Sequence, residues 1–369
     1  MKRVFIITII MLAFIWALGA YEINSSQNQY IVPKLQEEPK SVVNTKISSS
    51  TEPVLPTKKV AKKIATSTPV VKTPEIVAIP KAPEPIPDFE IINTNARKSL
   101  VNIFCTVKGN ELSPISGTGV VIDPKGIVLT NAHVGQYFLL KDLYVKNYIE
   151  CVLRTGSPAY PRYKVELVYI SPQWVRDNKT LLKSQNPQGT GENDFALLRI
   201  TGVIDGSTLP LNIPYLLPNT REILILNEPV ILVSYPAGFL GGLSIIRDLN
   251  VTSGITAIRD LFTFTENKID IISVPGTVVS QKGSSGGAVV DKNESLIGII
   301  TTSSSGNTTE ERNLNALTLA YINRNLKANI NLTLSEFLSE DVEKFAKNFQ
   351  ENEAVGLTKI ITDELTRNQ

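Results

Sequence analysis

The sequence predicts an all-β fold of two antiparallel six-stranded barrels, followed by C-terminal helices. Short apolar or alternating runs bounded by Gly, Pro, Asn and Asp recur along the chain, a pattern typical of barrels and sandwiches. They form two series of about six, which suits two barrels. The first series lies at 100–107, 119–122, 127–130, 143–153, 165–170 and 195–200. The second lies at 230–234, 249–258, 269–274, 287–290, 295–302 and 316–321.

Residues 1–21 are typical of an export segment. Lys2 and Arg3 supply a positive start, and residues 4–20 are almost wholly apolar. Two alternatives fit: a signal peptide cleaved after Gly19, or an uncleaved membrane anchor. We predict the anchor, because a long tether follows it. The two basic residues would then be cytoplasmic and the rest of the chain outside the cytoplasm, periplasmic or extracellular, whereas cleavage would give a secreted protein.

Residues 22–90 are predicted to be a disordered linker. Prolines recur from Pro33 to Pro87 among Lys, Thr, Ser and Glu, with no hydrophobic periodicity. Such a segment cannot bury enough apolar area to offset the entropy of ordering it. We therefore expect an extended spacer between the N-terminal segment and the folded part.

The folded part is predicted to comprise a barrel domain at 91–338 and a helical extension at 339–369. The polar stretch 172–192 is expected to be a loop inserted into the first barrel. Near the C-terminus, Thr333 or Ser335 can cap a run with helical spacing, and a second helix is expected at 354–366. We expect these helices to pack on the barrels rather than on a partner or a membrane.

Composition excludes several classes of function. The 369 residues carry a formal net charge of +2, which gives no indication of a nucleic-acid partner. Two cysteines are too few for a disulfide framework, and a single histidine makes a histidine-based metal site improbable. No metal or cofactor is expected.

The stretch from Gly283 to Gly287, with the sequence Gly-Ser-Ser-Gly-Gly, points to acyl-transfer chemistry. Glycine leaves the approach of a substrate carbonyl open and can adopt positive φ. The turn can therefore aim two backbone N–H groups and the Ser285 hydroxyl at one point. Taken alone, such a run is most often only a turn.

Two further residues supply what a hydroxyl nucleophile needs, a base and a carboxylate that orients it. His133, the one histidine, follows the apolar run that ends at Thr130, and Asp194 directly precedes another apolar run. Taken singly, His133 could be a core histidine and Asp194 a strand-end cap. Glu192 is the alternative carboxylate.

These pieces resemble the trypsin-like serine proteases of the chymotrypsin fold, and most closely their bacterial HtrA/Deg-type branch. The similarity covers about 92–338 and is carried by 116–123, 126–134, 193–198 and 251–255 around the nucleophile turn. It implies two barrels with the site in the cleft between them. It also implies Ser285 as nucleophile, His133 as base, Asp194 as its orienting carboxylate, and the N–H groups of Gly283 and Ser285 as the oxyanion hole.

Several positions depart from the family pattern. Ser284 stands where activated trypsins have an aspartate, and no activation site precedes the barrels, so zymogen activation of that kind is not expected. The tail is too short for the PDZ domain of many HtrA relatives.

Val134 replaces the cysteine that follows the histidine in vertebrate-type members. Cys105 and Cys151 both fall on first-barrel strands, where they could form a disulfide or remain two buried thiols.

The resemblance also suggests where the substrate side chain binds. It implies Val279 as the floor of the specificity pocket and Thr301, Thr302 and Ser303 as one wall. No aspartate occupies the floor, which argues against cleavage after Lys or Arg. We expect a small or medium apolar residue before the scissile bond.

The sequence therefore predicts an exported, membrane-tethered serine endopeptidase that acts on protein or peptide substrates. One alternative is a catalytically silent trypsin-like domain that serves as a tethered binding scaffold. Another is an esterase with the same triad. Because Ser, His and Asp are all present, the enzyme is favoured over the scaffold.

Overall fold

The computed structural model describes residues 88–184, 189–238, 240–264, 267–303 and 313–367. The predicted N-terminal segment and residues 22–87 of the predicted linker lie outside the described residues. None of the helices within these ranges has the length and apolar character needed to cross a bilayer.

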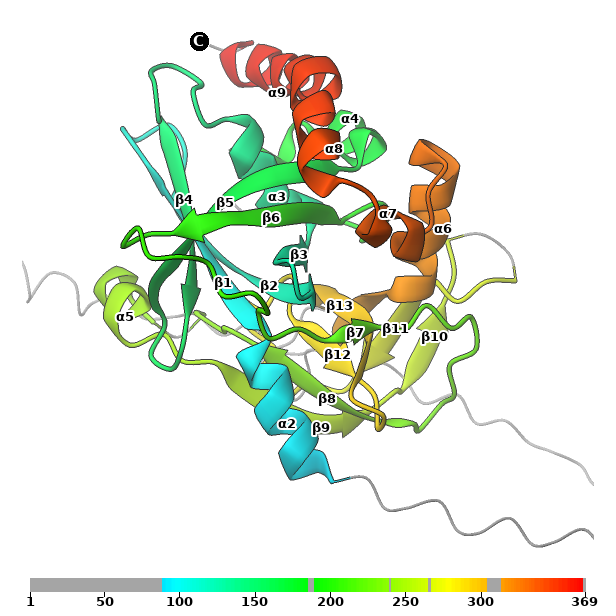
Figure 1. Ribbon diagram of the computed structural model, residues 1–369. Coiled ribbons are helices and arrows are strands. Elements are labelled where there is room, and N and C mark those ends of the chain that lie inside the picture. Colours follow the sequence, from blue (N-terminus) through cyan, green and yellow to red (C-terminus); the bar gives the residue numbers. More distant parts are fainter. Residues whose placement is uncertain (1–87, 185–188, 239, 265–266, 304–312, 368–369) are drawn as a thin grey trace, which may run out of the picture. The chain divides into compact units, whose positions relative to one another are not determined.

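Six antiparallel strands close into the first barrel in the order β1-β2-β3-β6-β5-β4 (Figure 1). Ile103, Val120 and Leu129 are among the residues fully buried in it. The strands are β1 (Leu100–Val107), β2 (Ile115–Asp123), β3 (Ile127–Thr130), β4 (Ile149–Thr155), β5 (Tyr160–Ile170) and β6 (Ala196–Val203). This barrel has the six strands that the sequence predicts.

The second sheet curls but stays open, with the order β10-β11-β14-β13-β12-β8-β9 and β7 paired in parallel with β13. Val230, Leu232 and Val289 lie in its buried core. The strands are β7 (Leu217–Pro218), β8 (Pro229–Ser234), β9 (Thr252–Ala257), β10 (Asp260–Phe262), β11 (Ile271–Val274), β12 (Ala288–Val290), β13 (Ser295–Ser303) and β14 (Leu314–Thr318). The trypsin-like double-barrel fold is confirmed, but eight strands replace the six predicted here. The two-residue β7 and three-residue β10 are too short to show a period of two.

Several short helices lie before or between the predicted strands, at positions where the sequence predicts no helix. They are α2 (Phe89–Lys98), α3 (Ala132–Leu139), α4 (Pro172–Asn178), a 3₁₀ turn (Leu181–Lys183) and α5 (Gly242–Arg247). The region expected as a polar loop thus contains α4. Ser171 caps α4 by accepting from the Trp174 N–H, and Trp174 and Val175 are buried. None of these helices exceeds ten residues, so the helical period has under three turns in which to appear.

Of the C-terminal helices, α8 packs on β5 of the first barrel and α6 packs on β13 and β14 of the second sheet, at the orange and red end of the ribbon in Figure 1. Thr333 caps α7 through a capping box with Glu336, and Asp341 starts a new helix where the sequence predicts one continuous run. The Phe349 ring lies 5.7 Å from that of Tyr169 on β5. The elements are α6 (Leu319–Ile330), α7 (Leu334–Ser339), α8 (Val342–Phe349), a π-helical turn (Gln350–Ala354) and α9 (Val355–Thr366).

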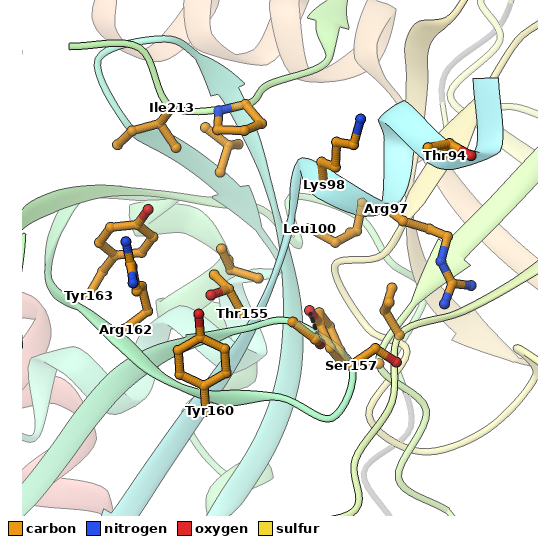
Figure 2. Close-up of a pocket in the computed structure, with 16 residues that line it drawn as sticks. Thr94, Arg97, Lys98, Leu100, Thr155, Ser157, Tyr160, Arg162, Tyr163 and Ile213 are labelled. Carbon is orange, nitrogen blue, oxygen red and sulfur yellow. Dashed lines mark hydrogen bonds between the residues drawn. The ribbon is translucent and has the colours of Figure 1, made fainter. Parts of the chain in front are cut away.

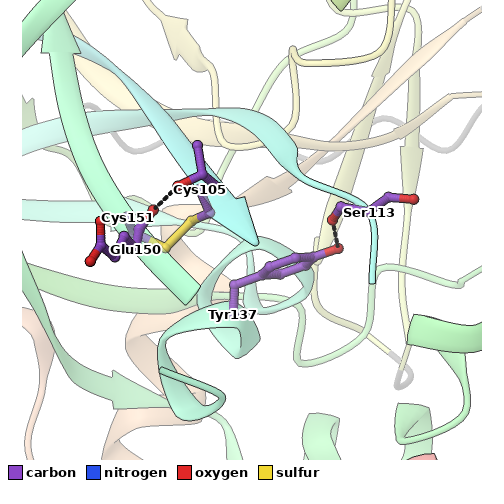
Figure 3. The surroundings of a disulfide bond; sticks show 6 residues. Cys105, Ser113, Tyr137, Glu150 and Cys151 are labelled. Carbon is purple, nitrogen blue, oxygen red and sulfur yellow. Dashed lines mark hydrogen bonds between the residues drawn. A yellow bond between two sulfur atoms is a disulfide. The ribbon is translucent and has the colours of Figure 1, made fainter. Parts of the chain in front are cut away.

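Cys105 on β1 and Cys151 on β4 form a disulfide (Figure 3). They are direct partners in the antiparallel register of the two strands. Beside them, the Tyr137 hydroxyl donates to the Ser113 carbonyl at 3.2 Å, which ties α3 to the connection between β1 and β2. Of the two alternatives for the cysteines, the structure shows the pair.

Replacing both cysteines by serine is expected to lower the free energy of unfolding by about 3 to 4 kcal/mol, because the cross-link closes a long loop in the unfolded chain. The sequence separation is 46 residues. Urea unfolding of the wild type and of the Cys105→Ser/Cys151→Ser variant measures the difference. Adding a reductant to the wild type should reproduce it. Equal unfolding midpoints for variant and wild type would contradict the prediction.

Candidate active site

His133 is held at the start of α3, directly after β3. Asn131 precedes the helix, and its Nδ2 donates to the backbone carbonyl of Asp194 at 2.9 Å. Gly135 lets the helix approach β6, because a Cβ there would lie 2.6 Å from the Cβ of Ala196. The His133 side chain keeps 33% of its surface exposed, so the ring is anchored on one side and open on the other.

Asp194 lies in a tight turn before β6, and the structure brings its carboxylate to His133. Its Oδ2 is 2.9 Å from His133 Nδ1, and its Oδ1 accepts from the His133 backbone N–H at 2.9 Å. Thr301 Oγ1, from β13 of the second sheet, donates to Oδ2 at 2.7 Å. Asp194 is buried, whereas Glu192, the alternative carboxylate, is exposed. The carboxylate is therefore fixed by groups from both sheets.

The turn that presents Asp194 is held by α6. Asn193 adopts a positive φ of 59°, and its backbone N–H donates to the Tyr321 hydroxyl at 3.1 Å. That hydroxyl donates to Asn193 Oδ1 at 3.0 Å, and Asn325 Nδ2 donates to the same oxygen. Tyr321 and Asn325 thus position the acid from the C-terminal part of the chain.

The attraction between His133 and Asp194 outweighs the effect of burial on the pKa of each residue. Burial alone would lower the pKa of His133, but the charge and hydrogen bond of Asp194 raise it above the ordinary value of 6.5. Burial alone would raise the pKa of Asp194. The charge of His133, with the hydrogen bonds from His133 and Thr301, instead holds that pKa below its ordinary value. The pair therefore favours an ionised carboxylate beside the imidazole.

The Ser285 turn depends on two glycines with positive φ. Gly283 has φ of 92° and Gly286 of 82°. A Cβ on Gly286 would lie 2.0 Å from the Thr118 carbonyl oxygen and 2.6 Å from Thr130 Oγ1, so only glycine fits against β2 and β3. Ser285 itself is partly exposed.

Two backbone N–H groups of this turn are left available. Ala237 N–H donates to the Lys282 carbonyl at 2.7 Å, and Gly287 N–H donates to the Ser284 carbonyl at 2.8 Å. The Lys282 carbonyl shares a peptide with the Gly283 N–H, and the Ser284 carbonyl shares one with the Ser285 N–H. A trans peptide points its C=O and N–H in opposite directions, so these two N–H groups face away from Ala237 and Gly287. Neither N–H donates to another group in the described ranges.

Ser284 fixes the same turn from beneath. Its side chain is buried, accepts from Ser234 Oγ at 2.9 Å and donates to the Val279 carbonyl. These neutral contacts lie where activated trypsins use an aspartate.

Thr118 links the Ser285 turn to the first barrel, and sequence analysis did not single it out. Its N–H donates to the Ser285 carbonyl at 2.8 Å, and its Oγ1 donates to the Gly283 carbonyl at 2.7 Å. The same Oγ1 accepts from the Tyr235 N–H at 3.0 Å. Thr130 Oγ1, three residues before His133, donates to the Thr118 carbonyl at 2.7 Å. A threonine that is buried between the two glycines Gly117 and Gly119 is the signal that could have drawn attention to it.

The structure thus brings the Ser285 backbone next to β2 and β3, and His133 follows β3 directly. The side chains of Ser285 and His133 are not hydrogen-bonded to each other. Among the described residues, no hydrogen bond connects His133 Nε2 with Ser285 Oγ. Catalytic hydrogen bonds are often long before substrate binds.

The residues predicted to bind the substrate side chain come from two segments, the one before the Ser285 turn and strand β13. Val279 is fully buried in the core of the second sheet. The Thr301 side chain points at Asp194, while Thr302 and Ser303 continue along β13. The roles of Val279, Thr301, Thr302 and Ser303 in specificity stay predictions.

No group of three or more His, Cys, Asp or Glu within the described ranges is arranged to hold a metal ion. Two β-sheets that place a His–Asp pair from one beside a serine in a glycine turn from the other define the class of double-barrel serine proteases. Residues 117–299 match the family model described as a trypsin-like peptidase domain. The chain therefore contains a trypsin-like peptidase domain and is a serine endopeptidase. The match does not single out the HtrA/Deg-type branch, which stays a prediction.

Two solved structures similar to the chain are of one protein, the Rv3671c protease from M. tuberculosis. Its active form shares 21% identity at a TM-score of 0.41, over 73% of this chain and 96% of that one. An inactive form with a serine-to-alanine substitution shares 19% identity at a TM-score of 0.39, over 67% and 95% of the two chains. None of the curated proteins compared with the chain matches it. The family assignment rests on the domain match.

Proposed function

We propose that the endopeptidase works through a His133-Asp194-Ser285 triad. The observation that carries this proposal is the 2.9 Å contact between His133 Nδ1 and Asp194 Oδ2. It leaves Nε2 as the ring nitrogen that can accept the Ser285 proton. Ser285 Oγ attacks the scissile carbonyl carbon, and the same proton then passes to the leaving amine. Water hydrolyses the resulting acyl-enzyme by the reverse proton path.

The N–H groups of Gly283 and Ser285 would stabilise the tetrahedral oxyanion. Both are unused within the described chain, and Thr118 and Ser284 hold the turn that carries them. In comparable sites, each donor lowers the transition state by about 3 to 4 kcal/mol.

Labelling with a fluorophosphonate probe tests the triad. The probe reacts with a serine whose base and oxyanion hole are assembled, and mass spectrometry of the digested protein locates the adduct. We expect a single adduct on Ser285 and hydrolysis of casein. An adduct on another serine would refute the assignment. Turnover of esters but not of casein would favour the esterase, and a folded protein that is not labelled would favour the binding scaffold.

The pH dependence of kcat/KM should show an acid limb with its midpoint above 6.5. Protonated His133 cannot accept the Ser285 proton, so activity falls as the pH drops through the pKa of this residue. Asp194 raises that pKa above 6.5, which places the loss of activity at a higher pH than for a free imidazole. Steady-state rates from pH 5 to 9 measure the midpoint, and a midpoint below 6.5 would contradict the prediction.

We further propose that the protein is exported and tethered to the membrane by residues 1–21, with residues 22–90 as the spacer. Lys2, Arg3 and the apolar run after them support this, as does the Cys105–Cys151 disulfide, because disulfides persist mainly in oxidising compartments. In fractionated cells we expect the protein in the membrane pellet, with its N-terminus intact and the peptidase domain open to protease added from outside. Recovery only in the cytosol would refute export.

A further inference from the structure

A cavity of about 540 Å³ lies apart from His133, Asp194 and Ser285, none of which lines it. Figure 2 shows Arg97 and Lys98, from α2, on one side of it and Tyr160 and Arg162, from β5, on another. The residues that line it include three cations and no carboxylate. Its volume falls in the range of small-molecule sites.

The three cations of this cavity have no acidic partner in the described chain. Arg97 Nη1 donates to Ser253 Oγ at 3.3 Å, and Lys98 Nζ donates to Asn95 Oδ1 at 3.4 Å. Both acceptors are neutral. Arg162 lies over the Tyr163 ring at 5.8 Å. Asp205 is near enough to attract Arg162, but none of the three cations forms an ion pair within 4.0 Å with a described carboxylate. The cavity therefore keeps the positive charge of Arg97 and Lys98, while Asp205 offsets part of that of Arg162.

The groups around these cations suit a small polyanion. Arginine presents a planar fork of donors that matches carboxylate and phosphate oxygens. The hydroxyl groups of Thr155, Ser157 and Tyr160 add donors at the rim. The buried side chains of Leu100 and Val121 close the floor.

Tyr235 connects this cavity to the Ser285 turn. It lines the cavity, and its hydroxyl donates to the carbonyl of Gly156, another lining residue, at 3.0 Å. Its backbone N–H donates to Thr118 Oγ1, which donates to the Gly283 carbonyl. A ligand that stabilises the position of Tyr235 would therefore also stabilise the hydrogen bonds that hold Gly283.

We propose that this cavity binds a small polyanion bearing carboxylates or phosphates, and that its occupancy stabilises the Ser285 turn through Tyr235. The binding site stands on the cavity alone, whereas its effect on the turn rests on the proposed function.

Calorimetric titration of the full-length protein with pyrophosphate and, separately, with citrate tests the site at constant ionic strength and distinguishes phosphate from carboxylate. We expect a Kd below about 1 mM for at least one of them. Affinity should fall by about tenfold or more in Arg97→Gln/Arg162→Gln, which removes two charges from the cavity. The control Lys344→Gln/Lys347→Gln removes two charges from exposed positions on α8 and should bind as the wild type.

Absence of binding by both anions, or an equal loss in the control variant, would overturn the site and leave only a solvated basic surface. If Arg97→Gln/Arg162→Gln does not fold, the exposed Lys98→Gln variant replaces it. Binding should then weaken by about threefold, and unchanged binding would overturn the proposal.

The rate of fluorophosphonate labelling tests the effect on the turn. A saturating concentration of the bound anion should raise the rate at Ser285 by about threefold or more in the wild type, and not in the Arg97→Gln/Arg162→Gln variant. An unchanged rate in a protein that binds the anion would refute the link through Tyr235. Complete lack of labelling would refute the proposed function instead, while the titration would still decide the site.

Discussion

The Asp194→Asn variant is expected to lose about 10⁴ in kcat while keeping its fold. The carboxylate accepts from both the backbone N–H and the Nδ1 of His133, and from Thr301 Oγ1. An amide has one acceptor oxygen, and its NH₂ group would favour the tautomer that carries the proton on Nε2. That tautomer cannot take the proton of Ser285. Stopped assays with a peptide substrate, at enzyme concentrations high enough to detect the residual rate, measure the loss.

Glu192→Gln is the matched control, because it neutralises the alternative carboxylate two residues away without touching the histidine. It should retain wild-type activity. The variants should also differ in pH dependence. Loss of the Asp194 charge removes what raises the pKa of His133 and leaves burial, which lowers it, so the acid limb of Asp194→Asn should move to lower pH. A comparable loss of kcat in Glu192→Gln, or wild-type kcat in Asp194→Asn, would contradict the proposed triad.

Much of the fold could be predicted because strands and turns depend on local patterns. Apolar runs between turn residues predict strands, and the glycines around Ser285 indicate a turn whose backbone must come close to its neighbours. The contact of His133 with Asp194 spans 61 positions, and it is expected because the resemblance to trypsin-like proteases implies it.

The residues that hold these groups in place could not be predicted in the same way. The hydrogen bond from Thr118 to Gly283 spans 165 positions, and that from Thr301 to Asp194 spans 107. Tyr321 and Asn193 are 128 positions apart. Such contacts depend on how the two sheets and α6 pack together, which no short sequence pattern encodes. For Thr301 the resemblance implies a place in the pocket wall, and it does not predict the hydrogen bond from the Thr301 hydroxyl to the buried carboxylate.

Thr118→Val is expected to lower kcat by about 10² with little change in KM. Removal of a single oxyanion donor costs about 10² to 10³ in kcat in comparable enzymes. Valine keeps the shape of threonine and the backbone bond to Ser285, but it removes the hydroxyl that holds the Gly283 carbonyl. Gly283 has a positive φ and no side chain that could hold it, so its peptide depends on hydrogen bonds such as the one from the Thr118 hydroxyl and the one from the Ala237 N–H to the Lys282 carbonyl. The substitution therefore loosens the turn whose N–H groups would bind the oxyanion, and the effect should appear in kcat.

Two further variants separate this positioning role from simple destabilisation. Valine leaves the buried Tyr235 N–H without its acceptor, which costs about 1 to 3 kcal/mol of stability. Rates must therefore be measured well below the unfolding temperature of each variant. Thr118→Ser keeps the hydroxyl and should restore most of kcat. Thr106→Val makes the same change at an exposed position of β1 and should leave kcat unchanged. If Thr118→Val is folded and reacts with the fluorophosphonate at the wild-type rate, Thr118 does not position the turn, and Ser284 with its partners Ser234 and Val279 must hold it alone.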